Sequence, residues 1–258
     1  MKKFKLAILL LTVILVFTSC SGLVGLFNKK KITGDGNVLG RSYEMTGDTP
    51  YRVVVKDISI GGVGIVNPAN LIFDESLADE LVISTDENIF LSLTVEVNDA
   101  NKTITVSGDA NTECTPTSFE ITVGGLVSDI NLAGGYNADI KFDTVKQTKL
   151  DIAGAVDGTI SYTDSESSVI KAAGAVDLKL SGNIQRMQTE VAGAATIKGY
   201  ELSADLADIS IAGASEIELT VNNELYAEMS GTTLIRYKGA AEIKKSDIAG
   251  FGEIIKVD

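Results

Sequence analysis

A small residue followed by glycine recurs at a short and steady interval through the second half of this chain of 258 residues. The pairs are Ala133-Gly134, Ala153-Gly154, Ala173-Gly174, Ala192-Gly193, Ala212-Gly213, Ser230-Gly231 and Ala249-Gly250. A period of roughly 20 residues is typical of a repeat protein, in which each unit buries its apolar face against its neighbours.

Apolar and polar residues alternate on both sides of each glycine. The residue two places before the glycine is always apolar, and the residue before that is always polar. A period of two indicates β-strands, and the units are rich in Gly, Thr, Ser and Val rather than in helix formers. We therefore predict an all-β fold, a parallel β-helix (solenoid) with coils of about 20 residues. An antiparallel β-sandwich is the alternative, but its hairpin signals are scarce after residue 130.

This fold makes a specific prediction for the middle of the repeat. Gly193 and Gly213 should occupy equivalent corners of successive coils, because glycine accepts backbone angles that other residues avoid. The inward neighbours expected to stack in the core are Val191 on Ile211 and Ile197 on Ile217.

The N-terminus has the layout of an export signal. Three lysines among the first five residues precede an apolar stretch at 6–17, and Thr18-Ser19-Cys20 follows. We predict a lipoprotein signal peptide at 1–19, lipidation at Cys20 and a lipid-anchored tether at 20–31. The chain is then exported and held at the outer face of a bacterial membrane, the outer membrane if the host has two. An ordinary signal peptide with an incidental cysteine, or an uncleaved anchor, are the alternatives.

The net charge and the cysteine content limit the kinds of function that the protein can have. Removal of residues 1–19 would change the net charge from −13 to −16, which disfavours nucleic acid as a partner. With Cys20 acylated, Cys114 has no partner for a disulfide. The chain contains no histidine, so a catalytic thiolate at Cys114 lacks its usual base.

Residues 32–120 have a less regular rhythm than 121–258. The segments 93–97 and 103–106 alternate and flank the turn Asn98-Asp99-Ala100-Asn101, which is the best hairpin in the chain. We assign 32–120 to a less regular N-terminal β portion and 121–258 to the regular coils, both within one domain.

Several motifs together resemble a known family. Gly34-Asp35-Gly36-Asn37 comes first, then Arg41, Asp86-Glu87-Asn88-Ile89, the Ala-Gly-Ala repeats, and a closing stretch over 213–250. In this order and spacing they are similar to the head GIN domain family, over nearly all of residues 32–256. The resemblance implies a bacterial exported protein, often a lipoprotein, with a right-handed β-helix and the label of auto-transporter adhesin.

An enzyme of the polysaccharide lyase type is the runner-up, because parallel β-helices include such enzymes. It would need clustered acids to hold calcium and a nearby base. The acids three places after a glycine, interrupted in three of seven units, are Asp157, Asp177, Glu216 and Glu253. A pocket has room only in the irregular portion, around Asp74, Glu75, Asp79 and Glu80.

We therefore predict a non-catalytic envelope lipoprotein without cofactor or metal, acting as an adhesin-like binding module or a structural module. Its expected partners are the membrane, through the lipid anchor, and a glycan or protein ligand. Self-association is a further option, because the open ends of a stack of strands can pair with each other.

Overall fold

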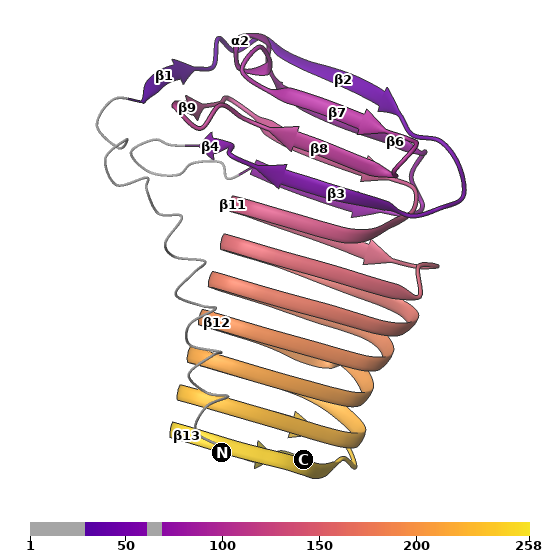
Figure 1. Ribbon diagram of the computed structural model, residues 1–258, viewed down its shortest axis with the longest axis vertical. Helices are drawn as coiled ribbons and strands as arrows, with labels where there is room; N and C mark the ends of the chain where they lie inside the picture. Colours follow the sequence, from indigo (N-terminus) through magenta and orange to yellow (C-terminus); the bar gives the residue numbers. More distant parts are fainter. Residues whose placement is uncertain (1–28, 61–68) are drawn as a thin grey trace.

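The computed structural model describes residues 29–60 and 69–258 (Figure 1). Within these ranges the chain is all-β apart from a single short helix, α2. The elements are β1 (Lys30–Thr33), β2 (Val38–Glu44), β3 (Tyr51–Lys56), β4 (Ser59–Ile60), β5 (Ala69–Asp74), β6 (Glu80–Asp86), α2 (Glu87–Phe90), β7 (Thr94–Asn98), β8 (Thr103–Ser107), β9 (Thr112–Thr115), β10 (Phe119–Gly124), β11 (Val127–Phe142), β12 (Gln147–Lys238) and β13 (Glu242–Lys256).

Successive turns of the chain from β11 to β13 lie on one another (Figure 1). β11 pairs in parallel with the start of β12, one repeat further along the chain, so that Gly134 lies beside Gly154. The end of β12 pairs in parallel with β13, where Gly231 lies beside Gly250. The repeat period predicted from the sequence is therefore the number of residues that separates paired positions in neighbouring turns.

Gly193 and Gly213 lie directly against each other in adjacent turns, as predicted. A Cβ atom added to Gly213 would lie only 2.0 Å from the carbonyl oxygen of Gly193, and the φ angle of Gly213 is +145°. A side chain here would collide with the neighbouring backbone, which explains why the position is always glycine. The four residues expected to stack in the core, Val191, Ile197, Ile211 and Ile217, are all buried.

The predicted right-handed parallel β-helix is nevertheless wrong as a description of the fold. β6 pairs antiparallel with both β2 and β10, and β7 pairs antiparallel with β8. These strands belong to the same sheet as β11, β12 and β13, with the order β2-β6-β10-β5-β11-β3-β8-β7. The result is a mixed sheet wound into a nearly closed, barrel-like form, and not a solenoid.

The error has a physical cause. The periodic glycines describe only the strands from β11 onward, whereas the N-terminal strands reverse direction at turns. The predicted hairpin over 93–106 is one of these reversals and is confirmed, since Val95 of β7 pairs antiparallel with Val106 of β8. A second, small sheet joins β1, β9 and β4 in parallel.

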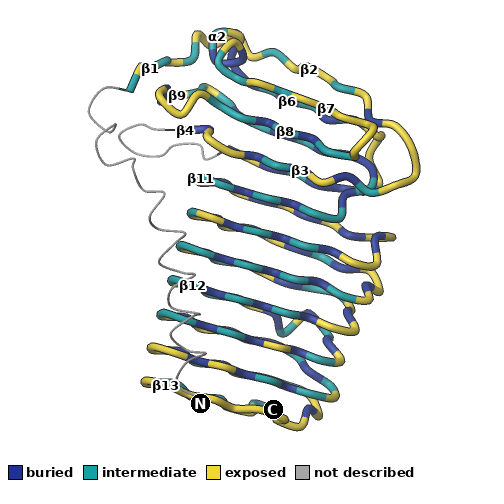
Figure 2. Tube along the Cα trace, viewed as in Figure 1, coloured by how far each residue is buried: buried dark blue, intermediate teal, exposed yellow. Residues whose placement is uncertain are grey.

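A continuous apolar core runs through the wound sheet. Buried and exposed residues alternate along most strands, as Figure 2 shows. Ile130, Leu132, Ile209 and Leu219 are fully buried, and each such side chain stabilises the fold by about 1.5–3 kcal/mol. Aromatic residues also contribute to the core, where the buried rings of Phe142 and Tyr162 stack with centroids 5.6 Å apart.

A buried carboxylate joins the N-terminal strands. Asp86, at the end of β6, is fully buried and accepts hydrogen bonds from the backbone N–H groups of Gly36 (2.8 Å) and Thr117 (2.7 Å). Burial opposes its ionisation, but the hydrogen bonds from Thr117 and Gly36 outweigh burial and lower its pKa. Gly34 packs so closely that an added Cβ would lie 2.4 Å from the Asp86 carboxyl carbon. Two motifs that are distant in the sequence, 34–37 and 86–89, therefore form a single structural unit.

Candidate functional site

A shallow groove of about 730 Å³ runs along the stacked turns of β11 and β12 and reaches Ile60 of β4. Its centre is formed by the residues that directly follow the repeated glycines. We call this feature the alanine groove. The residues that define it are Gly135, Ala155, Ala175, Ala194 and Ala214. All five are exposed, so the methyl groups of the four alanines face solvent in successive turns.

The groove follows from the local sequence. Gly154 has a φ angle of +140°, and an added Cβ would lie 2.1 Å from the carbonyl oxygen of Gly134 in the preceding turn. The glycines thus let adjacent backbones approach closely where the chain bends. The residues on both sides of each bend are small, so their own side chains leave the hollow open. Below it lie Val156 and Val176, which are buried and apolar.

One rim of the groove is acidic. The third residue after each glycine lines it, and this column includes Asp157, Asp177 and Glu216. The other two members of the column are uncharged. Glu216 forms an ion pair with Arg236 of the next turn. The rim therefore presents negative charge beside an apolar floor.

Among the described residues, the lining offers no exposed aromatic ring. Tyr136 lines one end, but only 2% of its surface is exposed, and its hydroxyl donates a hydrogen bond to the carbonyl of Ala133 at 3.0 Å. Burial raises the pKa of Tyr136, so the phenol stays protonated. The described lining therefore gives a sugar ring no aromatic face on which to stack.

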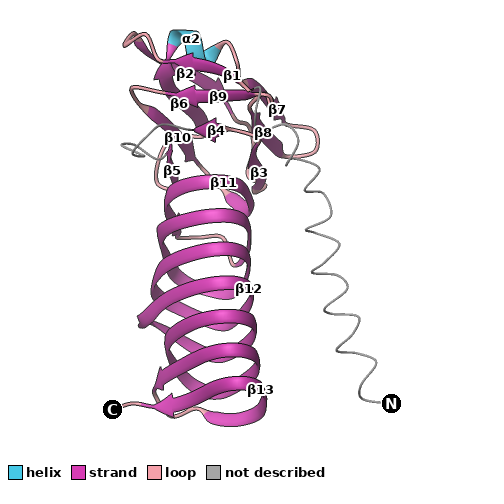
Figure 3. Ribbon diagram, turned by 90° about the vertical axis from the view of Figure 1, so that its left-hand side faces the viewer, coloured by secondary structure: helices cyan, strands magenta, loops and turns pink. Residues whose placement is uncertain are grey.

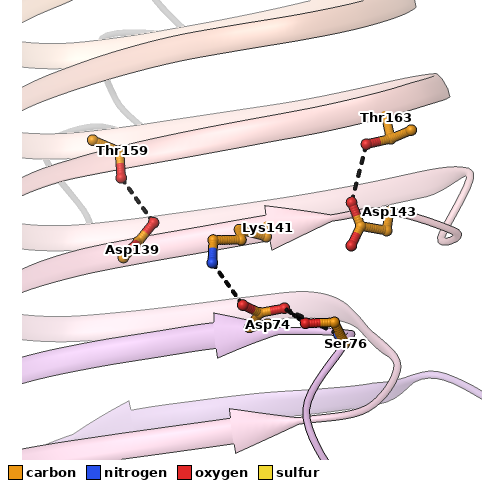
Figure 4. Close-up of polar contacts among 7 residues, drawn as sticks. All are labelled: Asp74, Ser76, Asp139, Lys141, Asp143, Thr159 and Thr163. Carbon is orange, nitrogen blue, oxygen red and sulfur yellow. Dashed lines mark hydrogen bonds and ion pairs between the residues drawn. The ribbon is translucent and has the colours of Figure 1, made fainter.

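Two of the four acids singled out in the irregular portion, Asp74 and Glu75, form hydrogen bonds or ion pairs with neighbouring segments. Asp74 accepts hydrogen bonds from the N–H and hydroxyl of Ser76 and forms an ion pair with Lys141 at 2.6 Å (Figure 4). The hydrogen bond from Lys141 lowers the pKa of Asp74 to about 2. Glu75 accepts hydrogen bonds from the N–H and hydroxyl of Thr144, at 2.6 and 2.7 Å.

Asp79 and Glu80 do not complete a catalytic set with them. Asp79 packs against Gly125, where an added Cβ would meet its carboxylate at 2.1 Å. Glu80 begins β6 and lies opposite Glu44 of β2. Asp74 and Glu75 therefore tie neighbouring segments together, and none of the four acids lines the alanine groove.

The other candidate residues are also dispersed. Three acids of the predicted column reach the groove rim, whereas Glu253 lies on β13 and outside the groove. In the part of the chain that the structure describes, no three His, Cys, Asp or Glu residues lie close enough to hold a metal ion.

Of the two cysteines, the structure describes Cys114. Cys114 is buried, with its Sγ atom 3.7 Å from the Ser92 hydroxyl. Burial raises the pKa of the Cys114 thiol, which keeps it protonated and unreactive. Cys20 and the predicted signal peptide lie outside the described residues.

α2, the one helix within residues 29–60 and 69–258, is not long and apolar enough to cross a membrane.

Sequence reasoning missed the groove itself. The Ala-Gly pairs predict corners, but the small residue after each glycine forms no recognised motif of its own. It occupies a position where alternation points the side chain outward, and a solvated face normally carries polar residues there. The signal that could have revealed the groove is a column of small apolar residues at positions that point outward.

Comparison with known proteins identifies a protein family that this chain matches. The family described as "Putative auto-transporter adhesin, head GIN domain" matches residues 61–241, so the resemblance drawn from the sequence motifs is confirmed. No curated protein matches the chain significantly.

Solved structures share the fold. One, titled a putative lipid binding protein from Parabacteroides distasonis, is 24% identical with a TM-score of 0.63, over 89% of this chain and all of that one. A putative adhesin from Bacteroides fragilis is 20% identical with a TM-score of 0.63, over 88% of this chain and all of that one. Another from Parabacteroides merdae is 16% identical with a TM-score of 0.54, over 89% of this chain and all of that one.

Proposed function

This chain belongs to the head GIN domain family, and we propose that it is a non-catalytic binding module of the bacterial cell surface. The observation that carries the proposal is the alanine groove, an exposed row of methyl groups with an acidic rim. An apolar strip left uncovered on a protein surface commonly marks a contact site.

The shape of the groove favours an extended ligand. Five turns at a spacing of about 4.8 Å make a strip roughly 20 Å long, which matches a short stretch of extended polypeptide. The floor gains free energy when apolar groups cover it, at about 25 cal/mol for each Å² removed from water. Asp157 and Asp177 on the rim favour basic side chains in the ligand.

Polypeptide is favoured over glycan for a specific reason. Sugar rings commonly stack on exposed aromatic side chains, and the described lining of the groove has none. The methyl floor also suits an acyl chain, and the P. distasonis neighbour is named for lipid binding. The carboxylates on the rim would repel the acidic head group of a fatty acid, which ranks that ligand below a basic polypeptide.

The absence of catalysis is part of the proposal. Several of the described acids and bases serve as partners for backbone groups or for one another, as Asp74 does for Lys141. A polysaccharide lyase would instead need several acids and a free base around one substrate. We expect no release of unsaturated sugars from uronate-containing polysaccharides, with or without calcium. Such release, lost on mutation of a groove acid, would overturn the proposal.

We further propose that the protein is exported and anchored through Cys20. Residues 1–19 would be removed, 20–31 would form the tether, and 32–120 with 121–258 would form one domain. The Cys20→Ala variant should remain as an unprocessed precursor or be released from membranes. A variant that fractionates and migrates like the wild type would contradict the anchor.

A bulky substitution in the alanine groove tests whether the groove is the binding site. Cells that carry the full-length protein are tested for binding to a panel of immobilised matrix proteins and glycans. Ala175→Trp places a large side chain in the groove and should abolish whatever binding the wild type has. Ala110→Trp is the matched control, because Ala110 is exposed and lies outside the groove. Equal loss in both variants, or in neither, would contradict the groove as the site.

A further inference from the structure

The last strand, β13, is an open edge. It pairs with β12 and with no other strand of the described chain. Figure 3 shows it at the end of the molecule opposite α2, and Figure 2 shows it exposed along most of its length. Its free N–H and C=O groups can pair with another strand, and exposed edges of this kind are normally protected.

The apolar core is also uncovered at this end. Ile248 is 45% exposed, whereas Met229, its counterpart in the preceding turn, is 3% exposed. Ile243 is 40% exposed, whereas its counterpart Leu225 is fully buried. Phe251, on the outward side of the same strand, is 87% exposed. At the opposite end of the molecule α2 contributes buried Ile89 and Phe90, so that end of the core is closed.

We propose that β13 pairs antiparallel with β13 of a second copy of this chain, about a two-fold axis through Ala249. The chain bends at Gly250, next to Ala249, so an axis through Ala249 places Gly250 of each copy opposite Ile248 of the other and offsets the two bends by two residues. The pairing satisfies the free backbone groups and covers both open cores. A two-fold interface uses the same surface twice and closes after two copies, so it makes a dimer and not a fibre.

The positions of the charged residues on β13 favour this register over its neighbours. Lys245 forms ion pairs with Glu228 and Asp247 of its own chain. About Ala249 it also lies opposite Glu253 of the other copy, which makes two further opposite-charge pairs across the interface. An axis through Gly250 would instead place Asp247 opposite Glu253, and like charges directly opposite are destabilising. An axis through Ile248 would leave Lys245 opposite Phe251. Registers that shift by a single residue would put outward side chains opposite inward ones.

The bulge in β13 limits the pairing to the same stretch. Ile243 pairs with Leu225 and Lys245 with Tyr226, so Lys244 is an extra residue. The regular edge therefore begins at Lys245, which is the residue that Glu253 of the second copy reaches. In this register Phe251 lies directly opposite Asp247 and diagonal to Ala249 and Lys245 of the second copy, whose methyl group and aliphatic stem can contact its ring.

Cysteine cross-linking of the full-length protein in its membrane tests the axis. Directly opposite residues have Cβ atoms about 4.5–5.5 Å apart, close to disulfide geometry, so Ala249→Cys should form a disulfide with its own copy under mild oxidation. A product of twice the monomer mass on a non-reducing gel is expected. The wild type, in which Cys114 is buried, and Ala110→Cys at an exposed distant site should not cross-link. Absence of the Ala249→Cys product, or equal yield from Ala110→Cys, would overturn the proposal.

Charge reversal tests the register. In the Ala249→Cys background, Glu253→Lys should lower the yield roughly five-fold, and the double reversal with Lys245→Glu should restore it. Lys245→Glu alone is not a clean test, because it also removes the ion pairs of Lys245 with Glu228 and Asp247 within the chain. Glu253 makes no ion pair in the described part of the chain, so its reversal leaves the monomer intact. A double variant that is not restored would contradict the register. A cross-linked product of any other mass would show that a different protein covers this edge.

Discussion

The strands from β1 to β10 and those from β11 to β13 are held in place in different ways. In the first region each strand has its own partners, and single contacts such as that of Asp86 with Gly36 and Thr117 join distant segments. In the second region one pattern of contacts recurs at each stacked glycine, from Gly134 to Gly250. The first region therefore depends on a few contacts that occur once, and the second on a close approach that every turn repeats.

The largest effect should come from disrupting that close approach. Gly213→Val places a branched side chain where an added Cβ would already lie 2.0 Å from the carbonyl of Gly193, at a φ of +145°. We expect a loss of roughly 3 kcal/mol or more in the free energy of unfolding, because neither backbone can move away without disturbing the next turn. Urea unfolding followed by circular dichroism measures it.

Gly135→Ala is the matched control for this prediction. Its φ lies outside the left-handed region, and an added Cβ would meet only the carbonyl of Ala155, at 3.9 Å. The substitution should change the free energy of unfolding by less than about 0.5 kcal/mol. If Gly213→Val were equally mild, the stacked glycines would not be what holds the turns together.

The next largest effect concerns the contact that joins the N-terminal strands. Asp86→Asn keeps the shape of the side chain but removes the buried charge to which the N–H groups of Gly36 and Thr117 donate. We expect a loss of about 2–3 kcal/mol, since hydrogen bonds to a buried charged group are strong and an amide nitrogen cannot accept. Asp35→Asn, at an exposed carboxylate that accepts from the N–H of Asn37, should cost less than about 1 kcal/mol. Equal losses in the two variants would contradict a special role for Asp86.

How far the sequence predicts the structure also differs between the two regions. Spacing alone placed Gly213 on Gly193, because every turn repeats the same rule. It did not predict that β6 pairs antiparallel with β2 and β10, since alternation within β6 says which face is buried and not which strands lie beside it. The hairpin β7–β8 was predictable because its turn is local. The alanine groove was not predicted, because whether a small residue is exposed depends on which way the chain bends.

The ion pair between Asp74 and Lys141 joins the two regions, and acid should weaken it. The pKa of Asp74 is about 2 in the folded protein and near 3.8 in the unfolded chain. A lowered folded-state pKa stabilises the protein above the unfolded value, and this stabilisation is lost as the pH falls from about 4 to about 2. Lys141 is partly exposed, so we expect the loss to amount to roughly 1–2 kcal/mol.

Unfolding measured across that pH range checks this contribution. Asp74→Asn should remove this part of the pH dependence while leaving the contributions of the other acids. A wild type and an Asp74→Asn variant with the same slope between pH 4 and pH 2 would contradict the assignment.

The smallest effect should come from the outward contacts between regular turns. Thr159 donates a hydrogen bond to Asp139 at 2.9 Å, and Thr163 donates one to Asp143 at 3.0 Å, each from one turn to the preceding one (Figure 4). Both contacts are exposed, so water replaces them at little cost. Thr159→Val keeps the β-branched shape and should change the free energy of unfolding by about 0.5 kcal/mol or less. The double variant with Thr163→Val should show simple additivity. A loss above about 1.5 kcal/mol from Thr159→Val alone would mean that side-chain ladders, and not the stacked glycines and the core, hold the regular turns in register.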